Sequence, residues 1–238
     1  MAYDVTTVPK FKIKPGTLGP IDIVDEHNAF VLYNNGDQWM VFNKANHDEI
    51  KEMYSSYDIA YGDVLVSGLG FGILALWLCS KPEVTSVTVV EISQEVIDLF
   101  KAVNNVPEKL NIVNHSILEY QSDREYDCLL LDHYERQTVQ WRLKNMQDIC
   151  SKIKHKNFWA WSLEQVYVMK MFNFNLTDFL NVSDSETKFN GKFDSSVSWI
   201  DFATKYLPSA NGILNIPLKT VNEYVYTYFN KHHLLGEQ

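Results

Sequence analysis

The sequence is poor in cysteine, in basic residues and in long apolar runs, and each shortage argues against a class of protein. Its three cysteines, Cys79, Cys128 and Cys150, lie inside apolar or helical patterns, which disfavours a disulfide framework and predicts buried, reduced thiols. The 21 basic residues are outnumbered by 30 acidic ones, so a large nucleic-acid footprint is not expected. No apolar run is long enough to span a membrane, and the first residues lack the pattern of a signal peptide. We therefore expect a cytoplasmic protein that binds neither membranes nor nucleic acid.

Metal-ligand spacing, internal repeats and low-complexity segments are lacking as well. None of the seven histidines has a partner at the spacing of a paired ligand, so no metal site is predicted. The 238 residues, of which 46% are hydrophobic, can bury the core of one sizeable domain. We divide the chain into an N-terminal β-hairpin and helix (1–60), a cofactor-binding domain (61–181) and a C-terminal extension (182–238). The extension is expected to shape the substrate site or an oligomer interface, such as that of a homodimer.

The N-terminal part carries a strong hairpin signal. Two β-prone runs, 30–33 and 39–42, flank the pair Asn35-Gly36, which favours a tight turn between antiparallel strands. Residues 1–20 show little periodicity and are expected to be an irregular lead-in. A helix is predicted over 47–54, with Asn46 as its cap.

Strand-like and helix-like segments alternate from Asp63 onward. The strand-like runs are apolar throughout, which is typical of strands buried on both faces of a parallel sheet. The pattern predicts an α/β domain with a doubly wound, mostly parallel sheet. The predicted strands are 64–66, 87–90, 110–113, 128–131 and 158–161, and the predicted helices are 73–78, 93–100, 135–154 and 163–172. Residues 182–195 read as a loop, 197–207 as amphipathic, and 220–229 suit a helix or a strand equally.

The turn between the first of these strands and its helix holds three alternate glycines, Gly68, Gly70 and Gly72. Glycine allows a tight turn and a close approach of a ligand to the backbone, and the helix start offers free N–H groups. Glu91 ends the next strand, where a carboxylate can accept hydrogen bonds from both hydroxyls of a ribose. The spacing is G-x-G-x-G, and Ile73 stands where a dinucleotide fingerprint would have its third glycine. The spacing therefore disfavours NAD as the cofactor.

The runs 63–73 and 89–93 resemble the class I S-adenosylmethionine (SAM)-dependent methyltransferases, and within them the spermidine synthase-like branch. The resemblance covers about residues 29–162 and implies a Rossmann-like methyltransferase fold that binds SAM or decarboxylated SAM. By this resemblance the turn lines the methionine and ribose parts of the cofactor, Glu91 holds the ribose, and the next residue packs on the adenine. A further contact, to the adenine amino group, is implied after the third strand. The implied cofactor-binding residues are Gly68, Leu69, Gly70, Phe71, Gly72, Glu91, Ile92, His115, Ser116 and Asp132.

The sequence departs from this family where the ammonium group of the cofactor is held. Many methyltransferases carry an acid two residues before the first glycine, and that position is Val66 here. Spermidine synthases carry an aspartate between the last two glycines, and that position is Phe71 here. Three alternatives follow: another group holds the ammonium, a modified cofactor is used, or binding is lost.

The residues Asp132, His133 and Tyr134 follow the fourth predicted strand and are the candidate catalytic residues. Methyl transfer needs an aligned nucleophile and often a base, a role open to Asp132 or His133, while Tyr134 can contact the substrate. Asp132 can equally cap the helix that starts near Glu135. The function predicted first is a SAM-dependent methyltransferase acting on an unidentified small molecule. The alternatives are an aminopropyltransferase using decarboxylated SAM and a polyamine, and a non-catalytic nucleotide-binding or assembly module.

Overall fold

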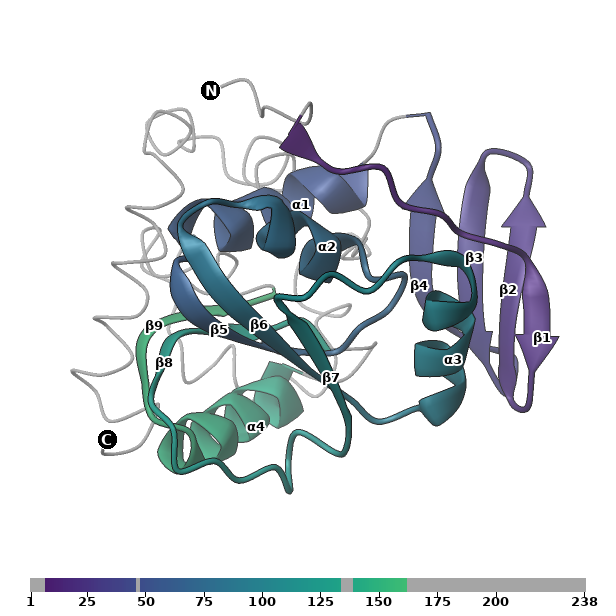
Figure 1. Cartoon of the computed structure of the whole chain (residues 1–238). Helices are drawn as coiled ribbons and strands as arrows, with labels where there is room; N and C mark the ends of the chain where they lie inside the picture. The colour runs from purple at the N-terminus through teal and green to yellow at the C-terminus, as the bar shows by residue number, and fades with distance from the viewer. Residues whose placement is uncertain (1–6, 46–47, 134–138, 162–238) are drawn as a thin grey trace, which may run out of the picture.

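The computed structural model describes residues 7–45, 48–133 and 139–161, and these residues build two sheets (Figure 1). An antiparallel sheet of four strands, here called the N-terminal sheet, has the order β1-β2-β3-β4. A parallel sheet of five strands follows, with the order β7-β6-β5-β8-β9. The fold is thus α/β with a doubly wound parallel sheet, as the sequence predicts.

The N-terminal sheet contains the predicted hairpin and two strands that the sequence analysis missed. Its strands are β1 (Gly16–Leu18), β2 (Ile21–Glu26), β3 (Ala29–Asn34) and β4 (Asp37–Asn43). The hairpin turn is confirmed, because Asn35 and Gly36 both have positive φ, at 49° and 86°. The expectation of an irregular lead-in up to residue 20 is wrong for β1. The alternation of buried Ile21 and Ile23 with Asp22 is the signal for β2.

The parallel sheet matches the predicted strands, with longer bounds. They are β5 (Gly62–Ser67), β6 (Val84–Glu91), β7 (Leu110–Asn114), β8 (Tyr126–Leu131) and β9 (His155–Ala160). The central residues of β5, β6 and β8 are buried on both faces, and Val64, Leu65, Leu129 and Leu130 are fully inaccessible. Because the chain crosses from β7 past β5 to β8, the winding direction reverses between β5 and β8.

Four helices cover the parallel sheet. They are α1 (Asp48–Ile59), α2 (Ile73–Ser80), α3 (Gln94–Val103) and α4 (Val139–Lys152). Helices α1 and α2 lie on one face and α4 on the other, while α3 stands next to the N-terminal sheet (Figure 1). The predicted cap of α3 is confirmed, since Ser93 Oγ accepts a hydrogen bond of 3.2 Å from Val96 N–H. Helix α1 runs five residues beyond the predicted end at residue 54.

One hydrophobic cluster joins the two sheets. It includes Ile21, Leu32 and Phe42 of the N-terminal sheet together with Val64 and Trp77 of the parallel domain. Two of the cysteines predicted to be buried, Cys128 and Cys150, are buried, and Cys79 is half-buried. Among the described residues, no helix is long and apolar enough to cross a membrane.

Several predicted features lie outside the described residues. They are the Asn46 cap, Tyr134, the start of the fourth helix at 135–138, the helix at 163–172 and the segments between 182 and 229.

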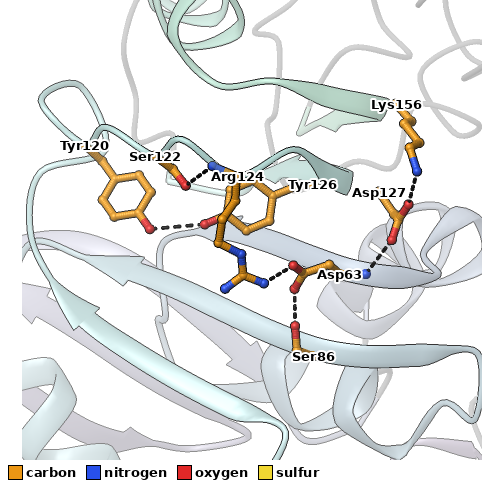
Figure 2. Close-up of polar contacts among 8 residues, drawn as sticks. All are labelled: Asp63, Ser86, Tyr120, Ser122, Arg124, Tyr126, Asp127 and Lys156. Atoms are coloured by element: carbon orange, nitrogen blue, oxygen red, sulfur yellow. Dashed lines mark hydrogen bonds and ion pairs between the residues drawn. The ribbon is translucent and has the colours of Figure 1, made fainter.

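A polar network ties together the amino ends of the parallel strands (Figure 2). Asp63 of β5 accepts hydrogen bonds from Ser86 of β6 and from Arg124, which precedes β8. Asp127 of β8 accepts the backbone N–H of Asp63 and the ammonium of Lys156 in β9, each at 2.8 Å. Lys156 and the Asp63 N–H therefore lower the pKa of Asp127. The network holds the edge of the sheet opposite to the candidate site.

Candidate functional site

The predicted site residues gather at the carboxyl ends of β5, β6 and β8. Backbone hydrogen bonds join these ends: Gly68 N–H donates to Val90 O (2.9 Å), and Asp132 N–H donates to Ser67 O (3.1 Å). Asp132 and Ser67 flank the point where the winding of the sheet reverses. In open α/β sheets, ligands bind in the crevice at this point.

The glycine turn leads directly from β5 into α2. Its glycines all have positive φ, at 88° for Gly68, 50° for Gly70 and 77° for Gly72. The side chains between them, Leu69 and Phe71, are buried in the hydrophobic core. The turn therefore presents little more than its backbone. Its N–H groups at Gly68, Leu69 and Gly72 donate to Val90 O, Glu91 Oε2 and Leu69 O.

Each glycine of the turn is approached closely by another part of the chain. A Cβ atom at Gly68 would lie 2.6 Å from the backbone oxygen of Asp132, and one at Gly72 would lie 2.2 Å from the ring of Phe100. A Cβ atom at Gly70 would lie 2.6 Å from the Sδ of Met40. Met40 belongs to β4, so the N-terminal sheet contributes a side chain to the cradle. No signal in the sequence pointed to this contact.

Glu91 reaches from the end of β6 to the glycine turn. Its Oε2 accepts the backbone N–H of Leu69 (2.8 Å) and its Oε1 accepts that of Ser93 (2.9 Å). Burial raises the pKa of Glu91, and the surrounding backbone N–H groups, that of Ser93 first, act in the opposite direction. The backbone N–H groups of Ile92 and Gly70 also act on this carboxylate, so backbone donors surround it. Through these contacts Glu91 joins the end of β6 to the glycine turn.

The residues predicted to surround an adenine lie beside Glu91. Ile92 is 65% exposed. Asn114, at the end of β7, donates hydrogen bonds to the backbone oxygens of Glu91 (3.1 Å) and Ile92 (3.0 Å). His115 is exposed, and its Nδ1 donates to the backbone oxygen of Ser116 at 2.9 Å. Asn114 was not predicted, although its place at a strand end is a usable signal.

Asp132 and His133 follow β8 and carry pKa shifts of opposite sign. Both are partly buried, and removal from water raises the pKa of Asp132 to about 7 and lowers that of His133 to about 4. The ring nitrogen Nδ1 of His133 is hydrogen-bonded to the hydroxyl of Ser67. Ser67 was not predicted, yet a polar residue that closes the apolar strand β5 is a signal that sequence reasoning could have used.

The site thus combines the glycine turn with the buried carboxylate of Glu91 that reaches it. The exposed Ile92 lies next to this carboxylate, and the titratable pair Asp132 and His133 lies across the switch point. Together with the strand order, these features define a Rossmann-like α/β protein. Among the described residues, no cluster of three histidine, cysteine or acidic side chains could hold a metal ion.

Comparison with known proteins returned solved structures only, since neither a family model nor a curated protein matches the sequence. One similar structure is spermidine synthase from Thermotoga maritima, 19% identical with a TM-score of 0.44, covering 59% of this chain and 52% of that one. A probable spermidine synthase from Corynebacterium glutamicum is 14% identical with a TM-score of 0.44, covering 64% and 63%. A SAM-dependent methyltransferase from Clostridium acetobutylicum is 16% identical with a TM-score of 0.33, covering 50% and 52%. The chain spans about half to two-thirds of the length of these three structures.

Proposed function

We propose that the protein is a SAM-dependent methyltransferase that acts on a small molecule. The observation that carries the proposal is the buried carboxylate of Glu91, aimed at the glycine turn and bonded to Leu69 N–H at 2.8 Å. This contact would join the two parts of an adenosyl cradle at the carboxyl edge of the sheet. The resemblance of the turn and of residues 89–93 to class I methyltransferases supports the same reading.

The cofactor would be held mainly by backbone and by one charge. Glu91 would accept the ribose hydroxyls, Ile92 would cover one face of the adenine, and the backbone of the glycine turn would face the sulfonium end. His115 and Ser116 would lie near the adenine edge. Bound in this way, SAM would supply an electrophilic methyl carbon close to the end of β8.

Asp132 is the residue we propose as the base. A group that accepts a proton works best when its pKa is close to the working pH, and the pKa of Asp132 is raised to about 7. His133, with its pKa lowered to about 4, stays neutral at pH 7 and is a weak base. We assign His133, held by Ser67, to contacting the acceptor substrate rather than to removing its proton, and Tyr134 to the same substrate side.

A second candidate is an aminopropyltransferase that uses decarboxylated SAM and a polyamine. It is favoured by the excess of 30 acidic over 21 basic residues, which is compatible with a cationic substrate such as a polyamine. Val66 and Phe71, the residues at the two positions where an acid for the ammonium group is missing, are buried in the core, with 1% and 4% of their surface exposed. Decarboxylated SAM lacks the carboxylate of SAM but keeps its ammonium group, so either cofactor needs another partner for that group.

Thermal unfolding with SAM, S-adenosylhomocysteine, decarboxylated SAM and NAD tests both candidates. A ligand at about 100 times its dissociation constant should stabilise the fold by roughly 2.7 kcal/mol. Stabilisation by SAM and its homocysteine product supports the methyltransferase, and a preference for decarboxylated SAM supports the aminopropyltransferase. No response to any adenosyl compound would rule out both.

Two matched variants test whether Glu91 is responsible for the stabilisation by the ligand. Glu91→Gln keeps the size of the side chain and removes its charge, and it should abolish most of the stabilisation by the ligand. Glu83→Gln removes the same charge from an exposed residue just before the other end of β6, and it should leave the response unchanged. If the two variants respond alike, Glu91 does not hold the ligand.

A further inference from the structure

A hollow of about 540 Å³ lies between the N-terminal segment, the N-terminal sheet and the end of α3. Its walls are apolar and come from parts of the chain far apart in sequence. The apolar lining residues are Phe11, Ile13, Phe30, Phe42 and Val103. None of these belongs to the site described above. A hollow of this volume is in the range of small-molecule sites in proteins.

The wall formed by the N-terminal segment is held in place. Asn104, just after α3, accepts the backbone N–H of Lys12 at 2.8 Å and donates to its backbone oxygen at 3.0 Å. Phe11 packs edge-on against Phe42, with ring centroids 5.2 Å apart. Because a side-chain amide and an aromatic pair fix the segment from both sides, the hollow is formed before any ligand arrives.

The hollow is lined by two basic side chains, although the net charge of the protein is −9. Lys12 and Lys14 both line it and are exposed, and within the described residues neither forms an ion pair. The ammonium of Lys44 lies 4.1 Å from the ring centroid of Phe30, and it forms an ion pair with Asp25. Asn104 also covers the carbonyl of Phe100 at the end of α3, so the negative end of that helix is partly satisfied.

We propose that this hollow binds a small amphipathic carboxylate, whose aliphatic or aryl body lies on the apolar wall and whose carboxylate pairs with Lys12 and Lys14. The apolar lining provides the hydrophobic part of the affinity, and the two lysines select for the anion over a neutral molecule of the same shape. The proposal is independent of the methyltransferase assignment, because no residue is shared between the two sites.

Octanoate and 1-octanol form a matched pair of probes, equal in chain length and different in charge. Titration of the full chain with each, followed by amide NMR shifts and by calorimetry, should show shifts at Ile13 and Val103 for both. Octanoate should bind several times more tightly. The Lys12→Gln/Lys14→Gln variant should weaken octanoate binding about fivefold and leave octanol within about twofold, as expected for two exposed ion pairs.

The control variant Lys10→Gln/Lys154→Gln removes the same charge from two exposed lysines outside the hollow and should leave both affinities unchanged. Val103→Phe fills the hollow and should weaken both probes. The proposal is overturned by equal binding of octanoate and octanol, by an octanoate affinity that survives loss of Lys12 and Lys14, or by shifts confined to other parts of the chain. It is also overturned if sedimentation shows a dimer that the Lys12→Gln/Lys14→Gln variant dissociates, because the hollow would then be an interface between copies.

Discussion

At the residue scale, burial reverses the order of the pKa values of Asp132 and His133. In the unfolded chain the ordinary pKa values of 3.8 and 6.5 make Asp132 the acid and His133 the base. In the folded protein the order is inverted, with about 7 for Asp132 and about 4 for His133. Each group alone prefers its neutral form, because both lose water without gaining a compensating charge.

This inversion has a consequence for stability between about pH 4 and pH 6.5. The folded pair then carries one proton, on Asp132, and the unfolded pair also carries one proton, on His133. Since both states bind the same number of protons, the pair adds no pH dependence to the free energy of unfolding.

Single substitutions should reveal the two opposite pH dependences that cancel in the wild type. In Asp132→Asn only His133 titrates, the unfolded state binds more protons, and stability should fall as the pH decreases from 6.5 to 4. In His133→Gln only Asp132 titrates, the folded state binds more protons, and stability should rise over the same range. Each slope should approach about 1.4 kcal/mol per pH unit relative to the wild type in urea unfolding. Wild-type slopes in both variants would show that burial does not shift these groups.

Sequence reasoning placed the candidate site residues at strand ends and in the turn, but it did not predict the contacts between them. Glu91, Asp132 and the glycines were predictable because a strand end and a turn carry local signals. Met40 and Ser67 were not predicted, because their roles arise from contacts with Gly70 and His133, which lie 30 and 66 positions further along the chain.

At the scale of elements, the junction of β5 and α2 depends on Gly72. Its left-handed backbone disfavours any side chain, and a Cβ there would also collide with the ring of Phe100 at 2.2 Å. Gly36, in the β3–β4 turn, has a similar φ of +86° but nothing within 4 Å of its Cβ position. Substitutions at the two glycines therefore distinguish the energetic cost of backbone strain from that of overpacking.

Gly36→Ala should lower the free energy of unfolding by about 1–2 kcal/mol, from backbone strain alone. Gly72→Ala should lower it by about 2–5 kcal/mol, because overpacking adds to the same strain. Chemical denaturation measures both values. Phe100→Leu should recover part of the loss when combined with Gly72→Ala and none when combined with Gly36→Ala. Equal losses at the two positions would show that the Phe100 contact has no energetic role.

Local patterns predicted most of the elements but not all of their ends. The β3–β4 hairpin and the Ser93 cap were predicted because each depends on residues close in sequence. The amino-terminal half of β6 was missed because Thr85 and Ser86 are polar, although Ser86 is tied to Asp63 of the neighbouring strand. Tertiary pairing extended the strand beyond its apolar run.

At the scale of the whole molecule, the N-terminal sheet and the parallel sheet share one core. Leu32 of β3 and Leu65 of β5 have 1% and 0% of their surface exposed, and the cluster that contains Leu32 runs into the parallel domain. Unfolding either sheet alone would expose to water the apolar residues that are buried between the two. We therefore expect the two sheets to unfold together.

Native-state hydrogen exchange checks this expectation. The amides of Leu32 and Leu65 should exchange with the same free energy, equal to that of global unfolding within about 1 kcal/mol. Gly72→Ala should lower both values by the same amount, although the substitution lies in the parallel domain. Exchange at Leu32 that is faster and insensitive to Gly72→Ala would show that the N-terminal sheet opens as a separate unit.

The sequence by itself determined the alternation of strands and helices, the glycine turn and the acid that ends the next strand, because these are properties of residues close along the chain. Only the tertiary structure decided the strand order β7-β6-β5-β8-β9, the contact of Met40 with the turn and the inverted pKa values of Asp132 and His133. Those features depend on which distant residues pack together and on how much water their packing excludes, and a one-dimensional pattern does not encode either quantity directly.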